Sequence, residues 1–256
     1  MIDASGSIGA RNWLGRRARQ RANRWIENLI EEVRENKIKT QTDSAIQVVA
    51  THRDPSGQLL EKKVAAVELI NILRPTVAAA RFIIFAAVAL HKYPHVSQKL
   101  RDNNEEYLSF FVHEVRRFYP FFPFVGALVS NKFNWEGYTF PKGTRVLLDL
   151  YGTNRDGRIW RDPHLFRPER FHEADINAFN IIPHGGGDYH TNHRCPGEDL
   201  TKELIKTALH FLLHDMQYEV PEQNMHISLS RVPAIPRSRF IISNVMSSGR
   251  HTDFTI

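Results

Sequence analysis

The chain contains a single cysteine, Cys195, and the residues around it constrain the fold more than any other stretch. A glycine run and a polar, His-rich loop precede the thiol, and Pro196 and Gly197 follow it. Beyond Gly197, apolar residues recur at helical spacing and predict an amphipathic helix with one buried face: Leu200, Leu204, Ile205, Ala208, Leu212 and Leu213. Cys195 is therefore expected just ahead of a helix N-terminus, where the helix dipole and the neighbouring Arg194 favour its thiolate. The glycines at 185–187 lack side chains and would let the backbone approach something flat or bulky.

Three interpretations of Cys195 remain open on this stretch alone. A lone cysteine is most often a buried structural residue. A zinc site is a second interpretation, because His190 and His193 crowd against Cys195 and His184 is near. Their spacing is unlike that of structural zinc sites, however, and no second cysteine completes the set. The third is an axial thiolate on a haem iron, which needs one cysteine, a closely approaching backbone and cationic groups for the propionates.

The overall composition excludes several classes of protein. At 256 residues the chain is one large domain or a fragment of one, and its hydrophobic content of 42% suffices for a core. The net charge of +6 is mild, with 28 acidic residues among 34 basic ones, which argues against a nucleic-acid-binding protein. No signal peptide is recognised at the start, and the longest apolar segment, Val77–Leu90, is interrupted by Arg81 and too short for a transmembrane span. We therefore expect a soluble, cytoplasmic protein in a reducing compartment, as the single cysteine also indicates.

A long apolar helical pattern runs from Glu61 to Lys92, and its middle contains Arg74 and Pro75. A proline inside a helix removes a backbone hydrogen bond and kinks the axis, at a cost of about 3 kcal/mol. An arginine in this apolar context must reach water or an anion. Arg74 could form a structural ion pair with a core carboxylate. Two costly residues side by side instead favour a kinked helix across a buried pocket, with a guanidinium that binds an anionic ligand.

The remaining pattern predicts a mainly α-helical chain with small β-sheets, an α+β fold. Helices are expected at Arg11–Arg34 and His95–Phe118, the second with Glu114 and Arg117 on one face among aromatic residues. The six arginines between Arg11 and Arg24 are interpreted as a solvated helix face. Strands are predicted within three stretches: Phe133–Leu150, Tyr218–Val220 and Arg231–Val245. The Pro- and Arg-rich stretch Asn154–Phe171 is predicted to be irregular.

Four motifs, in this order along the chain, make it resemble a cytochrome P450. Glu114-Val115-Arg116-Arg117 matches the Glu-x-x-Arg pair of the helix behind the haem, and Trp160–Phe166 occupies the meander region. Pro168-Glu169-Arg170-Phe171 matches the segment whose arginine completes that ion network, and Cys195-Pro196-Gly197 matches the cysteine loop. The resemblance implies haem b (iron protoporphyrin IX) as the cofactor. It also implies roles for individual residues: Cys195 as the iron ligand, His193 on a propionate, Gly197 in the cofactor-binding loop, and Glu114, Arg117 and Arg170 as a structural network.

The match is closer still to one branch of that family, the hydrogen-peroxide-dependent fatty-acid hydroxylases and decarboxylases. Arg74-Pro75 stands where other members carry an acid–threonine pair, and residues 182–187 (IPHGGG) follow the same branch. Asp188 and Thr191 depart from the superfamily's usual Phe and Gly before the cysteine. The resemblance implies that Arg74, beside Pro75, binds a fatty-acid carboxylate, and that this carboxylate is the acid–base for cleavage of hydrogen peroxide. It implies α or β hydroxylation, with decarboxylation as a further outcome, and no reductase partner.

The resemblance covers residues 1–246, with 247–256 expected as a flexible tail, but it begins inside the family's domain. We therefore expect the C-terminal part of the cytochrome P450 fold without its N-terminal portion, as a monomer. Helices at 77–90 and 200–213 would then expose apolar surface. The competing hypotheses are a reductase-dependent monooxygenase, an inactive haem-binding remnant and a zinc protein.

Overall fold

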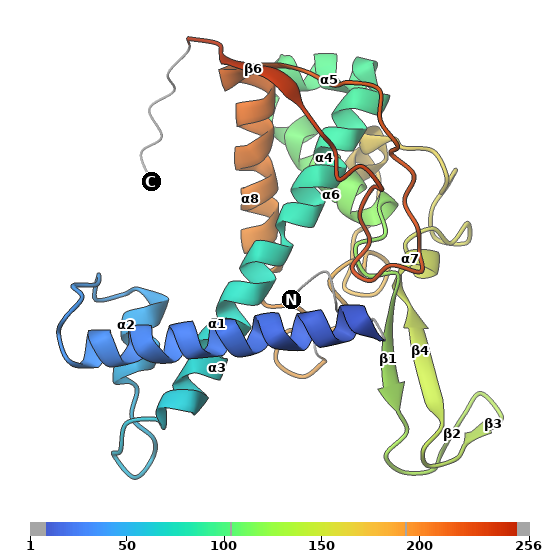
Figure 1. The fold of residues 1–256 in the computed structure, drawn as a ribbon. Coiled ribbons are helices and arrows are strands. Elements are labelled where there is room, and N and C mark those ends of the chain that lie inside the picture. The colour runs from blue at the N-terminus through green and yellow to red at the C-terminus, as the bar shows by residue number, and fades with distance from the viewer. Residues whose placement is uncertain (1–8, 103, 193, 250–256) are drawn as a thin grey trace. The chain divides into compact units, whose positions relative to one another are not determined.

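The computed structural model describes residues 9–102, 104–192 and 194–249 (Figure 1). Helices dominate, and the strands form three small two-stranded sheets, which confirms the predicted fold class. Contacts divide the chain into two compact units, residues 1–80 and 81–256.

The first unit consists of three helices, α1 (Ala10–Arg34), α2 (Ala45–Thr51) and α3 (Lys62–Ala78). One apolar face of each helix contributes to a shared core: Ile26, Ile30, Val33, Ala50, Ala65, Ala66, Leu69 and Ile70. Arg34 joins α1 to α2 and to the segment just before α3, because Nε donates to the Ala50 carbonyl at 2.8 Å and Nη2 to the Leu60 carbonyl at 2.9 Å. The arginines from Arg16 to Arg24 are exposed, as expected for a solvated helix face.

The long apolar pattern forms two helices, α3 and α4 (Ala80–Lys92), which Ala79 alone separates. Pro75 lies inside α3, and that helix ends at Ala78. In the described part of the chain, Lys62–Lys92 is long and apolar enough by length and composition to cross a membrane. This stretch is longer than the apolar segment Val77–Leu90 that the sequence pattern indicates. Most of α4 is buried in the core of the second unit, which is the pattern of a core helix.

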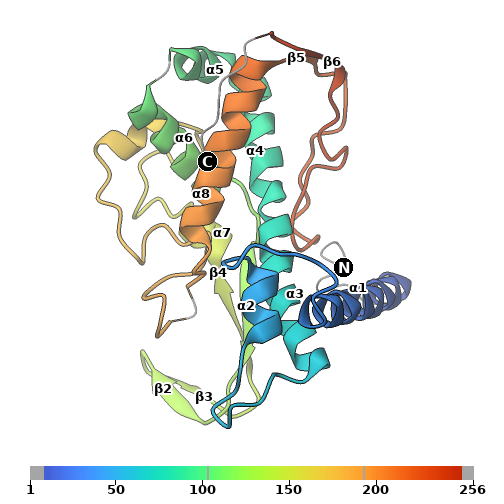
Figure 2. The ribbon, with the colours of Figure 1, turned by 90° about the vertical axis from the view of Figure 1, so that its left-hand side faces the viewer.

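The second unit is built around α4, α6 (Glu105–Phe118) and α8 (Glu198–His210), with α5 (Pro94–Arg101) beside them. Figures 1 and 2 show α8 running alongside α4. Their shared core includes the following buried side chains: Phe82, Phe85, Val88, Phe111, Val115, Ile205, Leu209 and Leu213. The single helix predicted at His95–Phe118 is wrong, because the Asn104 side chain starts a new helix by accepting the Tyr107 N–H at 2.9 Å.

Three antiparallel strand pairs complete the second unit: β1 (Phe124–Leu128) with β4 (Arg145–Asp149), β2 (Phe133–Trp135) with β3 (Tyr138–Phe140), and β5 (Met216–Glu219) with β6 (Ser243–Ser247). The predicted strands at 133–150 are confirmed, whereas in the predicted stretch 231–245 only the last residues join a strand. Between β4 and α8 lie the short helix α7 (Leu150–Thr153) and the 3-10 helix η2 (Pro168–His172), and α8 passes into a π-helical turn, η3 (Phe211–Asp215). The rest of 154–171 is irregular, as predicted.

The expected apolar exposure is found only in part. Val77 and Leu200 are 63% and 52% exposed, but Phe82, Ile205 and Leu209 are fully buried. The expectation of exposed apolar surface is therefore wrong for most of 77–90, because α4 packs in the core with α6 and α8. Within 200–213 one face is buried, while Leu200 and Phe211 remain exposed.

We predict that Phe111→Ala lowers the free energy of unfolding by about 3–5 kcal/mol, because it removes a fully buried ring from the core and leaves a cavity. Urea unfolding followed by circular dichroism measures the change. Phe179→Ala is the matched control, because Phe179 is 73% exposed. Equal losses in the two variants would contradict this assignment of the core.

Candidate functional site

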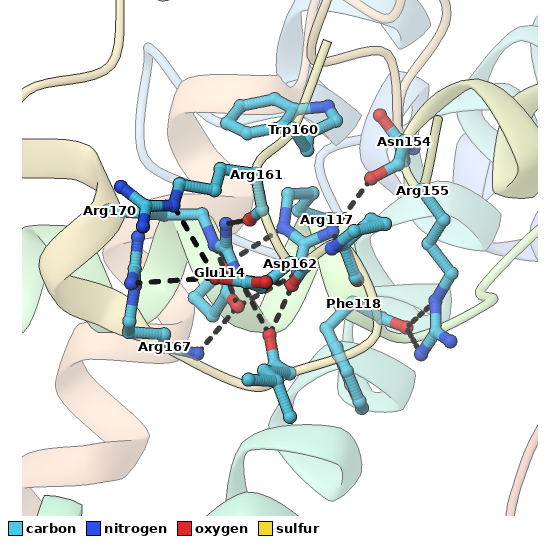
Figure 3. Close-up of polar contacts among 12 residues, drawn as sticks. Glu114, Arg117, Phe118, Asn154, Arg155, Trp160, Arg161, Asp162, Arg167 and Arg170 are labelled. Atoms are coloured by element: carbon cyan, nitrogen blue, oxygen red, sulfur yellow. Dashed lines mark hydrogen bonds and ion pairs between the residues drawn. The ribbon is translucent and has the colours of Figure 1, made fainter. Parts of the chain in front are cut away.

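Glu114 on α6 is the centre of a fully buried ion network (Figure 3). Its carboxylate accepts two hydrogen bonds from Arg117, from Nε at 2.7 Å and from Nη2 at 2.8 Å. Arg170 on η2 donates its Nε at 3.2 Å, and the Arg167 backbone N–H adds a bond of 2.8 Å. The structure thus brings Glu114, Arg117 and Arg170 into contact, and these donors replace the water that the carboxylate loses on burial.

The two guanidiniums also hold the irregular segment 154–171. Their remaining N–H groups donate to its backbone carbonyls: Asn154 (2.8 Å) and Pro163 (3.0 Å) from Arg117, and Asp162 (3.0 Å) and Leu165 (2.8 Å) from Arg170. The Asn154 side chain in turn accepts the Ile182 N–H at 2.8 Å, at the start of the cysteine loop. The network therefore extends from α6 to that loop.

Cys195 lies in the loop that leads into α8 and is partly exposed. Its N–H donates to the His184 carbonyl at 3.0 Å, and its own carbonyl accepts the Glu198 N–H at 3.3 Å. Gly197 is the N-cap of α8, and a Cβ there would lie 3.7 Å from the thiol sulfur. The thiol is thus placed just ahead of the helix, as the sequence predicts, and its role as a ligand stays a prediction.

The glycine run is required by the loop itself. Gly187 has a φ of +82°, and a Cβ there would meet Asn192 at 2.7 Å. A Cβ on Gly186 would meet the Ala178 carbonyl oxygen at 2.9 Å. The glycines therefore permit the backbone conformation and internal packing of the loop. Their predicted role in letting a flat group approach stays a prediction.

A second buried network, which the sequence analysis missed, surrounds Arg116; we name its members the Arg116 cluster: Arg116, Glu198, His113, His184, Arg194 and Tyr189. The fully buried Arg116 forms an ion pair with Glu198 Oε1, and its Nη1 and Nη2 lie 3.3 Å from the Nδ1 atoms of His113 and His184. Arg194 Nε donates to the other oxygen of Glu198 at 2.8 Å, and the Tyr189 hydroxyl lies 3.3 Å from it. The sequence contains one signal for this network, which is Arg116 itself, a second arginine next to Arg117 on a helix with aromatic flanks.

Burial and charge together fix the protonation states in the Arg116 cluster. Burial raises the pKa of Glu198, but the hydrogen bond from Arg194 and the charge of Arg116 outweigh it and hold that pKa at about 2. Burial and the charge of Arg116 lower the pKa of His184 to about 3 and that of His113 to about 4. At neutral pH one carboxylate is therefore paired with two guanidiniums, and both imidazoles are neutral.

Arg74 and Pro75 lie in α3 of the first unit, whereas Cys195 belongs to the second. The Arg74 side chain is exposed among exposed apolar neighbours, such as Ile72 (47%) and Val77 (63%). No carboxylate among the described residues pairs with Arg74, so the alternative of a core ion pair is not observed. This guanidinium can accept an anionic ligand, and its functional role stays a prediction.

The donor atoms near α8 fit a haem ligand better than a zinc site. His193, predicted to contact a propionate, lies outside the described residues. Within 9–102, 104–192 and 194–249, no three His, Cys, Asp or Glu side chains gather as a metal-binding group. A single, partly exposed thiol just ahead of a helix N-terminus fits the donor set of an axial thiolate, and this assignment stays a prediction.

Comparison with known proteins gives one consistent family. The sequence model of the cytochrome P450 family matches residues 11–241. The solved structure of cytochrome P450SP alpha is 46% identical, with a TM-score of 0.88, and the match covers 97% of this chain and 61% of that one. Cytochrome P450EX alpha with myristic acid is 40% identical, with a TM-score of 0.86 and coverages of 96% and 60%. A variant of cytochrome P450 OleT in complex with arachidonic acid is 34% identical, with a TM-score of 0.86 and coverages of 98% and 60%.

Two curated relatives match at lower identity or over a smaller share of this chain. The 7,8-epoxymelianol synthase of Citrus sinensis is 26% identical over 246 residues, which are 85% of this chain and 49% of that protein. Melianol synthase of Melia azedarach is 34% identical over 122 residues, covering 46% of this chain and 24% of that protein. The chain therefore spans about half or less of the length of these curated relatives and about 60% of the solved ones.

We predict that Glu114→Ala lowers the free energy of unfolding by at least about 3–5 kcal/mol, because it leaves two guanidiniums buried without their carboxylate. Urea unfolding measures the loss. Glu203→Ala is the control, because Glu203 pairs with Lys206 at 3.0 Å on an exposed surface of α8, where about 0–1 kcal/mol is expected. A loss at position 114 no larger than at 203 would contradict the network's structural role.

We predict that the folded chain loses stability as the pH falls from about 6.5 towards 4, in part through His113. Burial and then the charges of Arg116, Lys202 and Lys206 lower its pKa to about 4, while Glu198 opposes them. Because the unfolded chain then binds the proton first, the stabilisation is complete above about pH 6.5 and is lost on acidification, with a slope of up to about 1.4 kcal/mol per pH unit.

The replacement His113→Phe tests this pH dependence. Free energies of unfolding measured across the window should show a flatter pH dependence in His113→Phe than in the unmodified chain. His95→Phe is the control, because His95 is exposed on α5 and should leave the slope unchanged. Parallel pH profiles for all three proteins would show that His113 does not contribute.

Proposed function

The chain belongs to the cytochrome P450 family, and from that membership we propose that it forms part of a haem-thiolate enzyme that oxidises fatty acids with hydrogen peroxide. The observation that carries the proposal is the guanidinium of Arg74, next to Pro75 on an apolar helix, which has no carboxylate partner within the residues that the structure describes. The family's monooxygenases carry an acid–threonine pair at the place in the helix where this chain has Arg74-Pro75. Two solved relatives, at 40% and 34% identity, hold myristic and arachidonic acid, which supports a fatty acid as the substrate class here.

Haem b is the cofactor of this family, and Cys195 would supply the thiolate that holds its iron. When bound, the haem would supply the iron that activates the peroxide oxygen. Gly197 leaves the space beside the thiol sulfur open, His193 would hold a propionate, and the Glu114 network holds the segment that leads to the loop. Glu114, Arg117 and Arg170 thus act structurally and not on the substrate.

Arg74 binds the substrate carboxylate through a charge-assisted pair, and Pro75 gives the local helix geometry. The bound carboxylate would move a proton from one oxygen of the peroxide to the other, which departs as water. Hydroxylation then balances as fatty acid plus hydrogen peroxide giving hydroxy acid plus water. Decarboxylation balances as fatty acid plus hydrogen peroxide giving a terminal alkene, carbon dioxide and two waters. The position in which Arg74 holds the carboxylate decides whether the α or the β carbon lies at the reacting site.

The proposal includes a soluble, cytoplasmic monomer that needs no reductase. A reductase-dependent monooxygenase is the second candidate, and the plant synthases among the sequence relatives favour it. Their identity over most of this chain is lower than that of the fatty-acid-bound structures, so we rank it second. Turnover with peroxide alone separates the two candidates, and a chain that takes up no haem would be an inactive remnant.

We predict that the chain, expressed with haem supply, reduced and exposed to carbon monoxide, shows a strongly red-shifted Soret band that Cys195→Ala abolishes. Retention of that band in Cys195→Ala would contradict the assigned ligand. With peroxide and myristic acid, mass spectrometry should detect hydroxylated or decarboxylated product. Arg74→Ala should keep the band and lower turnover by about tenfold to a hundredfold, since it removes one charge-assisted pair.

Arg158→Ala is the matched control for Arg74→Ala, because the Arg158 side chain is 90% exposed and pairs only at the surface with Asp156. Its turnover should equal that of the unmodified chain. If Arg74→Ala and Arg158→Ala turn over equally fast, Arg74 does not bind the substrate carboxylate.

A further inference from the structure

The Arg116 cluster contacts the chain on both sides of Cys195. His184 precedes the cysteine and Glu198 follows it, and both contact one nitrogen, Nη2 of Arg116. The distance from this nitrogen to His184 Nδ1 is 3.3 Å. Because a guanidinium can only donate, Nδ1 of His184 is the acceptor and its ring proton is on Nε2.

The same two residues hold the backbone of Cys195. Its N–H donates to the His184 carbonyl at 3.0 Å, and its carbonyl accepts the Glu198 N–H at 3.3 Å. The His184 ring also stacks on Phe82 of α4, with centroids 5.1 Å apart, which restricts its movement. The contacts therefore form a closed ring that includes the thiol-bearing residue. It runs from Arg116 through His184, Cys195 and Glu198 back to Arg116.

Stability alone does not account for Arg116. A buried ion pair usually stabilises a protein no more than apolar residues of the same size. The Nε of Arg116 is moreover buried without a hydrogen-bond partner among the described residues, which adds a desolvation penalty. Because the fold keeps a buried arginine at this position despite the cost, we infer that Arg116 has a role that an apolar side chain could not take.

The electrostatics of the loop supply such a role. Glu198 is the first residue of α8, where the positive end of the helix dipole favours its carboxylate. Arg116 and Arg194 bind both carboxylate oxygens and so hold this residue between two guanidiniums. The cluster thus fixes the end of the loop that directly follows Cys195.

We propose that Arg116 and Glu198 are positioning residues for Cys195, which fix the loop so that the sulfur is presented as a thiolate ligand. His184 transmits the constraint from Arg116 to the Cys195 amide. The inference rests on the proposed role of Cys195 as the haem ligand, and it extends that role to residues outside the Glu114 network.

Four variants and one control test this inference in the full chain. Glu198→Gln keeps the shape and removes the charge, and Arg116→Lys keeps the charge and removes the planar fork. His184→Leu removes the Nδ1 acceptor, whereas His184→Asn places an amide oxygen near its position. Glu203→Gln is the matched control for Glu198→Gln, since it makes the same chemical change in an exposed ion pair on the same helix.

Hydrogen exchange of the haem-free chain, followed by mass spectrometry of peptides that contain Cys195, is the first measurement. We expect the Cys195 amide to exchange about tenfold faster in Glu198→Gln, Arg116→Lys and His184→Leu, with recovery in His184→Asn and no change in Glu203→Gln. Equal exchange in all five variants would overturn the inference, whether or not the chain binds haem.

The second measurement is the share of bound haem that shows the red-shifted carbon monoxide band. We expect this share to fall at least about twofold in Glu198→Gln and His184→Leu and to recover in His184→Asn. Phe111→Ala should lower global stability without changing the share, which separates positioning from general destabilisation. If Glu198→Gln and His184→Leu match Glu203→Gln in this share, the positioning role is overturned.

These outcomes distinguish the two proposals. Absence of the band in the unmodified chain would count against the proposed function for this chain, while the exchange measurement still decides the positioning role. If Arg116→Lys does not fold, the two His184 variants decide the question, because they leave the ion pair of Arg116 with Glu198 in place.

Discussion

The buried carboxylate of Glu114 is the interaction on which the second unit depends. Residues 154–171 contain only the short helix η2 and have no hydrogen-bond ladder of their own. Their backbone carbonyls still need donors once they are removed from water. Arg117 and Arg170 supply these donors, and both can be buried because Glu114 offsets their charge. The ion network therefore takes the place of regular secondary structure in this segment.

Helix α6 organises two networks because it presents two neighbouring faces. Glu114 and Arg117 are three residues apart, and so are His113 and Arg116, so each pair lies on one side of the helix. One pair leads to residues 154–171 and the other to the cysteine loop. Since both networks share the same helical turns, the position of the loop is tied to that of the irregular segment, and the Asn154 bond to Ile182 joins them again.

The sequence predicts those features that depend on short-range spacing. Glu114 with Arg117, the thiol ahead of a helix, and the strands within 133–149 all follow from local patterns, whereas β1, the partner of β4, was not predicted. The pairing of Arg116 with Glu198 does not, because the two residues are 82 positions apart and only the tertiary fold brings them together. The break at Asn104 depends on a side-chain cap whose sequence signal is weak beside the helical pattern around it. The burial of α4 likewise depends on α6 and α8, which local periodicity cannot place.

Two arginines in this chain differ in whether the guanidinium already has partners within the structure, and this difference separates a structural arginine from one that can bind a ligand. Arg116 is fully buried, and its two terminal nitrogens already contact a carboxylate and two imidazoles. A further anion there would have to displace Glu198 and leave a buried charge without its partner, which is strongly unfavourable. Arg74 is exposed among apolar side chains and has no carboxylate partner in the described part of the chain. An amphipathic acid would give that guanidinium its counterion and cover the surrounding apolar surface at the same time. This contrast is why we propose Arg74, and not Arg116, as the site for a fatty-acid carboxylate, and why the role that we propose for Arg116 is confined to the cysteine loop.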